Sequence, residues 1–204
     1  MPMREHEAII NKVFRILCSY KPQPEALRDH LTQVLDGRFY PDRKILFERG
    51  SIVKDVLFVS DGYVACYGFS DAGDRQVLSI AAKNTIVSGK SFTTQTPSTF
   101  EWVCLPGTYL MAIGYEALQD THARFPGTEE LSRIVIAEAA ERELLERLSL
   151  YKDAEMVVKN FYNSFKEFKI PGRMMLDVDI ASYLLIGEST LRNVRGKLIK
   201  DGRW

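Results

Sequence analysis

The chain has 204 residues, of which 46% are hydrophobic and 26% charged. It is long enough to bury a core, and its formal net charge of zero does not indicate indiscriminate adhesion to nucleic acids or membranes. The three cysteines are far apart and no histidine lies within a helical turn of another, which argues against a disulfide framework or a metal site. The sequence shows no signal peptide and no apolar run approaching roughly 18 residues. We therefore expect a cytoplasmic protein with no membrane partner.

Residues 5–34 have the pattern of helices. Apolar residues recur three and four positions apart on both sides of a break at KPQPE, which starts at Lys21. His30 lies at the edge of the second apolar face, where a packed side chain explains it more simply than a metal ligand does.

From Gly37 to about Tyr115 the chain has the character of strands. Six short runs rich in Val, Ile and aromatic residues are separated by turn residues such as Asp61-Gly62, and they read KILFE, DVLFVS, YVACYGF, RQVLSIAA, FEWVCL and TYLMAI. Strands at this spacing with no helix between them predict either an antiparallel sandwich or a jelly-roll-like antiparallel β-roll. A closed roll of this size has room for one small ligand.

A polar loop from Lys83 to Phe100 interrupts the strands. It combines many hydroxyl groups with a cation beside a glycine, and such a combination can form a backbone nest for an anion. The candidate effector-binding residues are Ser88, Gly89, Lys90, Ser91, Ser98 and Thr99. The alternative is a polar loop that only covers the end of the roll.

A long helix is predicted over residues 128–152, with Thr128 as its N-cap. One face follows the alternating three- and four-residue spacing of a coiled-coil seam. The seam residues are Ile134, Ala137, Glu141, Leu144, Leu148 and Tyr151. Because further apolar residues such as Leu131 and Val135 lie off the seam, the helix can both pack on the roll and meet a second copy, and we predict a homodimer. The alternative is a helix that packs only on its own roll.

Residues 153–204 are predicted to form a small all-α unit. An amphipathic helix from Asp153 to Phe168 precedes a break at Pro171-Gly172. Two short apolar faces then follow at helical spacing, first Ile180 with Leu184 and then Leu191, Val194 and Leu198. Two helices joined this tightly predict a helix-turn-helix, with the small Ala181 where they cross.

Polar and cationic side chains are predicted to project from the second helix of this pair, away from its apolar face. They are Ser189, Arg192, Asn193, Gly196 and Lys200. A supported helix with such a face can enter a DNA major groove. From Tyr151 onward the chain has ten Lys and Arg against seven Asp and Glu, a net charge of +3, in the direction that a DNA-binding unit requires. The alternative is a plain helical hairpin, because any amphipathic hairpin has a polar outer face.

Two sets of motifs stand in this order of elements. The first set is in the strand region, where Gly50, Gly62 and Gly73 lie in the stretches FERG, DGYV and DAGDRQVL. The second is in the predicted helical hairpin, which contains DIASYL and STL, followed by Val194 and Leu198. The chain thereby resembles the CRP/FNR family of bacterial transcription regulators from about Leu27 to Arg203. The resemblance implies an α+β fold, in which an antiparallel β-roll domain (residues 1–127) and a long connecting helix (128–152) precede an all-α helix-turn-helix domain (153–204).

The resemblance also implies a function. It predicts a homodimeric DNA-binding regulator with no catalytic activity and no cofactor, whose partners are a palindromic double-stranded DNA site, a small-molecule effector and RNA polymerase. Base edges would be faced by Ser189, Arg192 and Asn193, and phosphates by Thr190, Arg195, Lys197 and Lys200. The alternative is a small-molecule sensor or protein-interaction module with a degenerate helix-turn-helix that does not bind DNA.

The sequence departs from the family's pattern at several of these positions. Lys90 stands where nucleotide-binding members have a glutamate for the ribose hydroxyl, and no arginine near Ser98 is available for the cyclic phosphate, so we expect an effector other than cyclic AMP. Leu185 stands in the turn where a glycine is usual, and Gly187 where a Ser or Thr commonly caps the second helix. Asn193 occupies a position where relatives use arginine, which predicts a preference for adenine.

Overall fold

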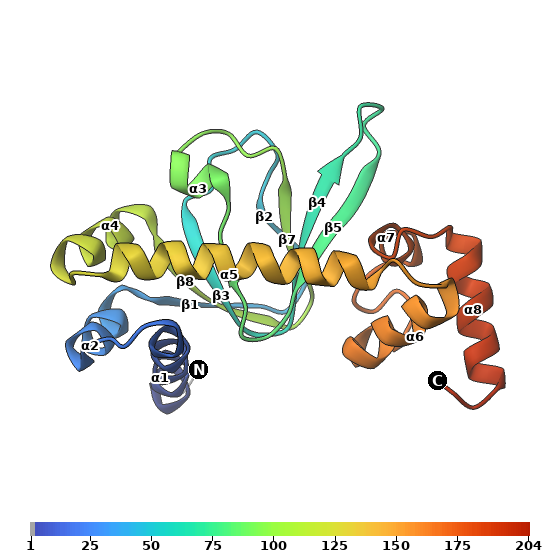
Figure 1. The fold of residues 1–204 in the computed structure, drawn as a ribbon, viewed down its shortest axis with the longest axis horizontal. Helices are drawn as coiled ribbons and strands as arrows, with labels where there is room; N and C mark the ends of the chain where they lie inside the picture. Colours follow the sequence, from blue (N-terminus) through green and yellow to red (C-terminus); the bar gives the residue numbers. More distant parts are fainter. Residues whose placement is uncertain (1–2) are drawn as a thin grey trace. The chain divides into compact units, whose positions relative to one another are not determined.

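The structure, a computed structural model, describes residues 3–204 (Figure 1). The chain forms two compact units. One runs as far as Val64 and resumes over Ala81–Ala140, and the other consists of Ala65–Ile80 and Glu141–Trp204. The three segments expected from the sequence divide the chain differently, and that division stays a prediction.

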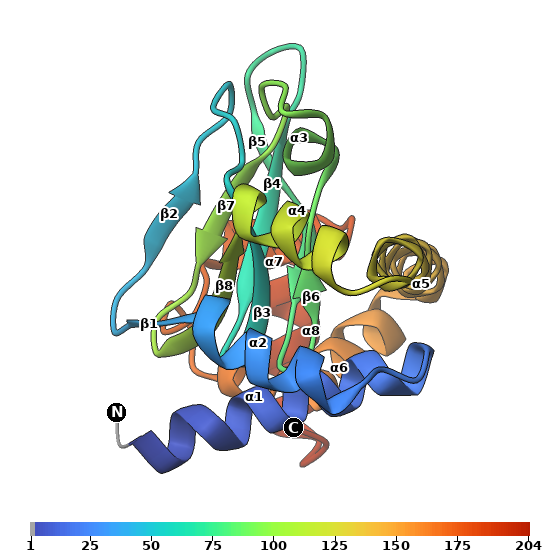
Figure 2. The same cartoon turned by 90° about the vertical axis from the view of Figure 1, so that its left-hand side faces the viewer.

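Two helices precede the strands, as predicted. They are α1 (Met3–Tyr20) and α2 (Glu25–Val34), and they lie side by side in Figure 2. The predicted break separates them, since Pro24 flanks α2 in an extended conformation. Their buried apolar residues pack with residues of the strands in one cluster, made mainly by Ile10, Val13, Phe14, Leu27, Leu31, Phe58, Met111 and Ile113.

Two antiparallel sheets form the predicted roll, and the fold class is therefore α+β as expected. The strands are β1 (Asp36–Tyr40), β2 (Lys44–Phe47), β3 (Asp55–Asp61), β4 (Val64–Phe69), β5 (Arg75–Ala81), β6 (Ile86–Val87), β7 (Glu101–Cys104) and β8 (Thr108–Gly114). Within the described residues the strand orders are β1-β8-β3-β6 and β2-β7-β4-β5. The six predicted runs are all strands, whereas β1 and the two-residue β6 were not predicted.

Strands β3 and β8 present different residues to the two faces of their sheet. Leu57 pairs with Ala112, and Phe58 pairs with Met111. Because successive side chains of a strand point to opposite faces, Leu57 and Ala112 join one apolar cluster inside the roll. Phe58 and Met111 join the other cluster, with α1 and α2. The sheet is therefore apolar on both faces.

The three glycines that the sequence motifs share all have positive φ angles. The values are 85° at Gly50, 80° at Gly62 and 87° at Gly73. At Gly62 a Cβ atom would lie 2.4 Å from the Oγ1 atom of Thr108, so a side chain does not fit there. The motif glycines thus mark turns that other residues would strain.

Three further helices precede the C-terminal ones, the first between β6 and β7 and the other two after β8. They are α3 (Lys90–Thr94), α4 (Tyr115–Arg124) and α5 (Thr128–Ser149). The long helix α5 ends at Ser149, three residues before the predicted end, and α3 and α4 were not predicted. Thr128, predicted as the N-cap, is the first helical residue, and its hydroxyl donates to the carbonyl of Phe125 at 2.8 Å. The sequence of α4 has only a weak apolar pattern. Among the described residues of this helix, only Ala117 and Leu118 pack on the cluster that α1 and α2 form with the strands. His30, expected at the edge of an apolar face, is buried, with Nε2 2.9 Å from the Oγ1 atom of Thr121.

The C-terminal helices are α6 (Ala154–Ser164), the 3₁₀ helix η1 (Lys166–Lys169), α7 (Asp177–Tyr183) and α8 (Glu188–Lys200). Asp153 caps α6 as predicted, and its carboxylate accepts a hydrogen bond from the backbone N–H of Met156 at 3.0 Å. The helix predicted as far as Phe168 ends at Ser164 and continues as η1, so that prediction was too long. The predicted helix-turn-helix is α7 and α8.

Candidate nucleic-acid interface

A tight turn joins α7 to α8. Leu185 has φ = 57°, the left-handed conformation that the usual glycine would adopt without strain. Its N–H donates to the carbonyl of Ser182 at 3.2 Å, and the N–H of Ile186 donates to the carbonyl of Ala181 at 3.1 Å. These two hydrogen bonds form a Schellman motif that ends α7. A leucine thus occupies the left-handed position of this turn.

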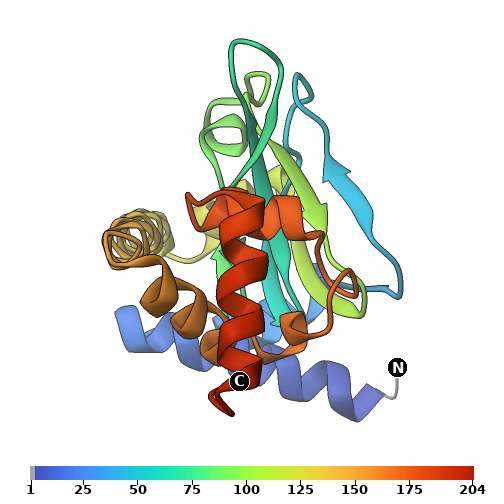
Figure 3. The same cartoon turned by 90° about the vertical axis from the view of Figure 1, so that its right-hand side faces the viewer.

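A core shared by three helices supports α8. Leu191 and Leu198, predicted to form its apolar face, are fully buried, and so is Ile180 of α7. The aromatic rings of Phe161 and Tyr162 on α6 lie in the same unit and are buried as well. Figure 3 shows α8 in front of α6 and α7, both of which it contacts. These two aromatic residues of α6 therefore belong to the core of the unit.

The outer face of α8 contains the predicted polar stripe. Its exposed members are Ser189, Arg192, Asn193, Gly196 and Lys200. Thr190 is half-buried, and Lys197 is exposed beside the stripe. Within residues 3–204, the side chains of Ser189, Asn193 and Lys200 have no polar partner. They are therefore available to hydrogen-bond to an external surface.

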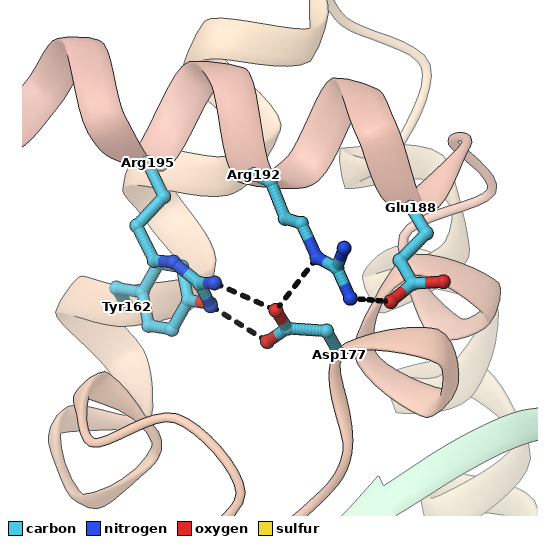
Figure 4. Close-up of polar contacts among 5 residues, drawn as sticks. All are labelled: Tyr162, Asp177, Glu188, Arg192 and Arg195. Carbon is cyan, nitrogen blue, oxygen red and sulfur yellow. Dashed lines mark hydrogen bonds and ion pairs between the residues drawn. The ribbon is translucent and has the colours of Figure 1, made fainter.

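Arg195 lies differently from these residues. Its guanidinium makes a bidentate pair with the carboxylate of Asp177, with both N–O distances at 2.6 Å, and it also donates to the hydroxyl of Tyr162 at 3.2 Å (Figure 4). The two charged side chains are only 12% and 13% exposed. The hydrogen bond from Arg195 is the main cause of a lowered pKa of Asp177. This ion pair connects the start of α7 to the middle of α8.

Arg192 is exposed but not free. Its Nη2 atom pairs with the carboxylate of Glu188 one turn earlier on α8, and its Nε atom lies 3.4 Å from Asp177 Oδ2 (Figure 4). The guanidinium thus points along the helix toward acidic groups of its own chain. A contact with DNA would require Arg192 to exchange these partners for a base or a phosphate.

A second acidic group holds cations at the end of α8. Glu155 of α6 pairs with Lys197 at 2.6 Å and with Arg203 at 2.7 Å. The hydrogen bond from Lys197 and then that from Arg203 lower the pKa of Glu155, so the carboxylate is ionised at neutral pH. Because Lys197 is 60% exposed, its side chain can turn away from this partner at little cost.

The hairpin of β4 and β5 contacts α7 within the second compact unit. The hydroxyl of Tyr67 donates to the buried carboxylate of Asp179 at 3.2 Å. The backbone N–H of Val77 donates to the hydroxyl of Ser182 at 3.1 Å. These contacts join residues more than 100 positions apart, so no local pattern in the sequence indicates them.

The candidate effector residues of the polar loop do not all point to one place. The hydroxyls of Ser91 and Ser98 are buried and hold the loop itself: Ser91 accepts from the N–H of Val53 at 3.0 Å, and Ser98 donates to the carbonyl of Phe100 at 2.9 Å. Lys90 and Thr99 are exposed, while Ser88 and Gly89 are half-buried before α3; these are the remaining four candidates.

The predicted seam of α5 lies open in the single chain. Leu144, Leu148 and Tyr151, which follows the helix, are 71%, 64% and 82% exposed. Leu131 and Val135, which lie off the seam, are buried. The helix therefore has two apolar faces, of which one is packed and one is not. The remaining seam residues are Ile134, half-buried, and Ala137 and Glu141, exposed.

The cysteines and other potential metal ligands of the described residues do not cluster. Within residues 3–204, no group of three or more His, Cys, Asp or Glu side chains could hold a metal ion. Cys66 and Cys104 are buried, and burial raises the pKa of their thiols to about 12 and about 11. In the same part of the chain, no helix is both long and apolar enough to cross a lipid bilayer.

No family model matches the sequence, and no curated protein matches it either. Solved structures do resemble the chain. FixK2 of Bradyrhizobium japonicum aligns with a TM-score of 0.62 and 18% identity over 83% of this chain and 86% of that chain. CLP, described as a c-di-GMP-responsive global regulator of Xanthomonas campestris, aligns with a TM-score of 0.60 and 17% identity over 88% and 93%.

A further match is described as a transcriptional regulator of the CRP/FNR family from Eubacterium rectale. It aligns with a TM-score of 0.65 and 14% identity over 90% of this chain and 89% of that chain. At these identities the likeness shows the fold. The chain has the CRP/FNR-type fold of a β-roll followed by a long helix and a helix-turn-helix.

Proposed function

We propose that the protein is a homodimeric transcription regulator that binds double-stranded DNA through α8. The observation that carries the proposal is the exposed polar face of α8 on a buried three-helix core. Such a helix projects hydrogen-bonding groups at a depth that suits a major groove. The fold shared with CRP/FNR-type regulators supports the proposal at the level of architecture.

The contacts within the unit suggest a division of roles on α8. Ser189 and Asn193, which have no polar partner among the described residues, would reach base edges, and Arg192 would join them after leaving Glu188. An asparagine can pair with adenine through two hydrogen bonds. Phosphate contacts are proposed for Thr190, Lys197 and Lys200.

Arg195 has a supporting role in this proposal. The sequence suggested a phosphate contact, but its guanidinium is already bound by Asp177 and Tyr162. A bidentate pair that is nearly buried would be lost if Arg195 turned outward. Arg195 therefore would position α8 against α7 and would not contact DNA.

The unpacked seam of α5 would pair with a second copy. A two-fold dimer places its two recognition helices about 34 Å apart, one turn of DNA, and so requires a palindromic site. An effector in the roll would need to favour the DNA-competent arrangement by only about 1–3 kcal/mol. Because Lys90 cannot accept a hydrogen bond from a ribose hydroxyl, that effector would not be cyclic AMP. RNA polymerase would be a further partner at a promoter.

Selection from random duplex DNA tests the proposal. The native chain is expected to enrich a palindrome with half-sites one turn apart, and the double variant Arg192→Ala, Asn193→Ala is expected to lose that preference. The matched control is Lys159→Ala, Asn160→Ala, which removes the same kinds of group from exposed neighbours on α6. Enrichment by the native chain with equal loss in both double variants would contradict the role of α8.

One observation favours a second function, a protein-interaction module whose helix-turn-helix does not bind DNA. Most cations near α8 are paired with acids of the same unit: Arg192 with Glu188, and Lys197 and Arg203 with Glu155. This pairing lowers the positive potential that attracts DNA. If the protein does not bind DNA even at low salt, this second function is favoured.

A further inference from the structure

A cavity of about 430 Å³ lies in the unit that contains α1 to α4. One wall of the cavity is the face of β3 and β8 that points away from the roll interior. The other walls are formed by α1, α2, α3, α4 and the first part of α5, which surround this face in Figure 2. Its volume is within the range of roughly 300–1,000 Å³ that is usual for small-molecule sites. The polar loop's Lys90 does not line it.

Most of the cavity wall is apolar. From the helices it is lined by Val13, Leu27 and Leu31, and from the strands by Phe58 and Met111, all of which are buried. An occupant that meets these side chains must itself be largely apolar, because an unpaired polar group would lose its hydrogen bonds to water. The wall therefore favours a ligand that has a hydrocarbon part.

Polar side chains also line the cavity, and two of them are hydrogen-bonded to each other. His122 of α4 and Ser132 of α5 both line the cavity, and the ring Nε2 atom lies 3.0 Å from the hydroxyl oxygen. Burial lowers the pKa of His122, so its imidazole is uncharged at neutral pH. A neutral imidazole and a hydroxyl each have capacity for one more hydrogen bond. Glu129 and Arg133, which also line the cavity, lie 3.8 Å apart and offset each other's charge.

We infer that this cavity binds a small, uncharged, mainly aliphatic molecule with one hydrogen-bonding oxygen atom. Its hydrocarbon part would lie against Phe58 and Met111, and its oxygen would bond to the pair formed by His122 and Ser132. At about 30 Å³ per water-sized group, the cavity holds roughly a dozen non-hydrogen atoms.

The ligand's position also connects it to α5. Leu131, Ser132 and Val135 line the cavity, so an occupant touches the helix that carries the proposed dimer seam. The inference names a ligand class for the proposed effector, and it rests on the proposed function only for the ligand's regulatory role. The binding test contains no DNA, so its failure is distinguishable from a failure of DNA binding.

Calorimetric titration of the purified full-length chain tests the inference, with decanol, decanoate and decyltrimethylammonium as probes of equal chain length. Decanol is expected to bind with one site per chain. The two charged probes are expected to bind at least about tenfold more weakly, because the cavity offers no unpaired counter-charge. Absence of saturable decanol binding, or equal binding of all three probes, would overturn the inference.

Two variants locate the site. Val56→Phe adds bulk at a half-buried position of the wall, and Ser132→Leu removes the hydroxyl; each is expected to weaken decanol binding about tenfold or more. Lys44→Ala, at an exposed position outside the cavity, is expected to bind decanol as the native chain does. Thermal melting without ligand establishes that each variant is folded. Unchanged binding in both folded cavity variants would place the ligand elsewhere and refute the assignment.

Discussion

Asp177, the first residue of α7, and Arg195, in the middle of α8, form a bidentate ion pair whose two N–O distances are both 2.6 Å. The pair joins the first turn of α7 to the middle of α8. It fixes the direction of α8 relative to α7, and Arg192 approaches the same carboxylate. The position of the proposed DNA-reading face therefore depends on one acidic side chain.

Asp177→Asn is expected to destabilise the helical unit by about 2 kcal/mol, because it removes a charged partner from the nearly buried Arg195. Trp204 can report this unfolding in a Trp102→Phe background, since its ring lies 4.4 Å from that of Tyr162 and the chain has only two tryptophans. Urea denaturation followed by fluorescence measures the difference. Asp201→Asn is the control, because its pair with Arg203 is exposed to water and its loss is expected to leave the free energy of unfolding almost unchanged.

The contribution of Asp177 is expected to vanish in acid. Its folded-state pKa lies below its ordinary value, mainly because Arg195 donates hydrogen bonds to the carboxylate. An acid with a lowered folded pKa stabilises the fold above its unfolded pKa, about 3.9, and loses that contribution as the pH falls through the folded value. The stability difference between native and Asp177→Asn chains should be constant above about pH 5 and shrink below about pH 4. A constant difference throughout would refute this account.

Leu185→Gly is expected to stabilise the helical unit by about 0.5–1 kcal/mol. The left-handed conformation strains a leucine by about 1–2 kcal/mol, and glycine removes this strain. Glycine is also more flexible in the unfolded chain, which reduces the gain in stability by about 0.5–1 kcal/mol. Little burial is lost, because Leu185 is 63% exposed. Leu184→Gly, at a buried right-handed position, should instead destabilise by more than about 3 kcal/mol. Equal destabilisation by both changes would exclude strain at the turn.

Leu148→Arg is expected to separate the proposed dimer, because it places like charges opposite each other in an apolar seam. Sedimentation of the variant at micromolar concentration should give the mass of one chain, where the native protein gives two. Leu145→Arg, at an equally exposed position beside the seam, is expected to remain dimeric. A native chain that sediments as a monomer would refute the dimer itself.

Glu188→Gln is expected to raise the affinity for DNA about fivefold, or about 1 kcal/mol. It releases the guanidinium of Arg192 and removes a negative charge from the N-terminal end of α8. Electrophoretic mobility shift with a selected duplex measures the change. The control is Asp71→Asn, which removes the same charge from an exposed turn in Ala65–Ile80, the other segment of the same compact unit. Its affinity for DNA should stay within about twofold of that of the native chain.

Elements with a strong local pattern could be predicted from the sequence. The apolar spacing of α8 and the continuous apolar run of β3 place Leu191 and Leu57 in the interior without knowledge of the rest of the chain. The helix α4 has few apolar residues, and β1 begins at Asp36-Gly37, a pair that reads as a turn. Weak or contradictory local signals therefore explain the elements that were missed.

The side-chain partners of the candidate interface could not be predicted. Spacing on a helix places Arg192 and Arg195 near one outer edge, but only the fold shows that Asp177 is within reach of both. The same holds for Lys197 and Glu155, which are 42 positions apart. For Leu185 the sequence identified the unusual residue, and the structure adds that the backbone adopts the left-handed conformation regardless. Long-range pairs of this kind depend on the packed arrangement of helices.

The most direct test of DNA binding by α8 is an anisotropy titration of the native chain against a selected palindromic duplex and its scrambled counterpart at two salt concentrations, roughly 50 and 200 mM. With Lys197 and Lys200 from each of two protomers on phosphates, the logarithm of affinity should fall with the logarithm of salt at a slope of about −4. The palindrome should bind more tightly than the scrambled duplex at both concentrations. Equal affinity for both duplexes, or an affinity that does not change with salt, would contradict the account.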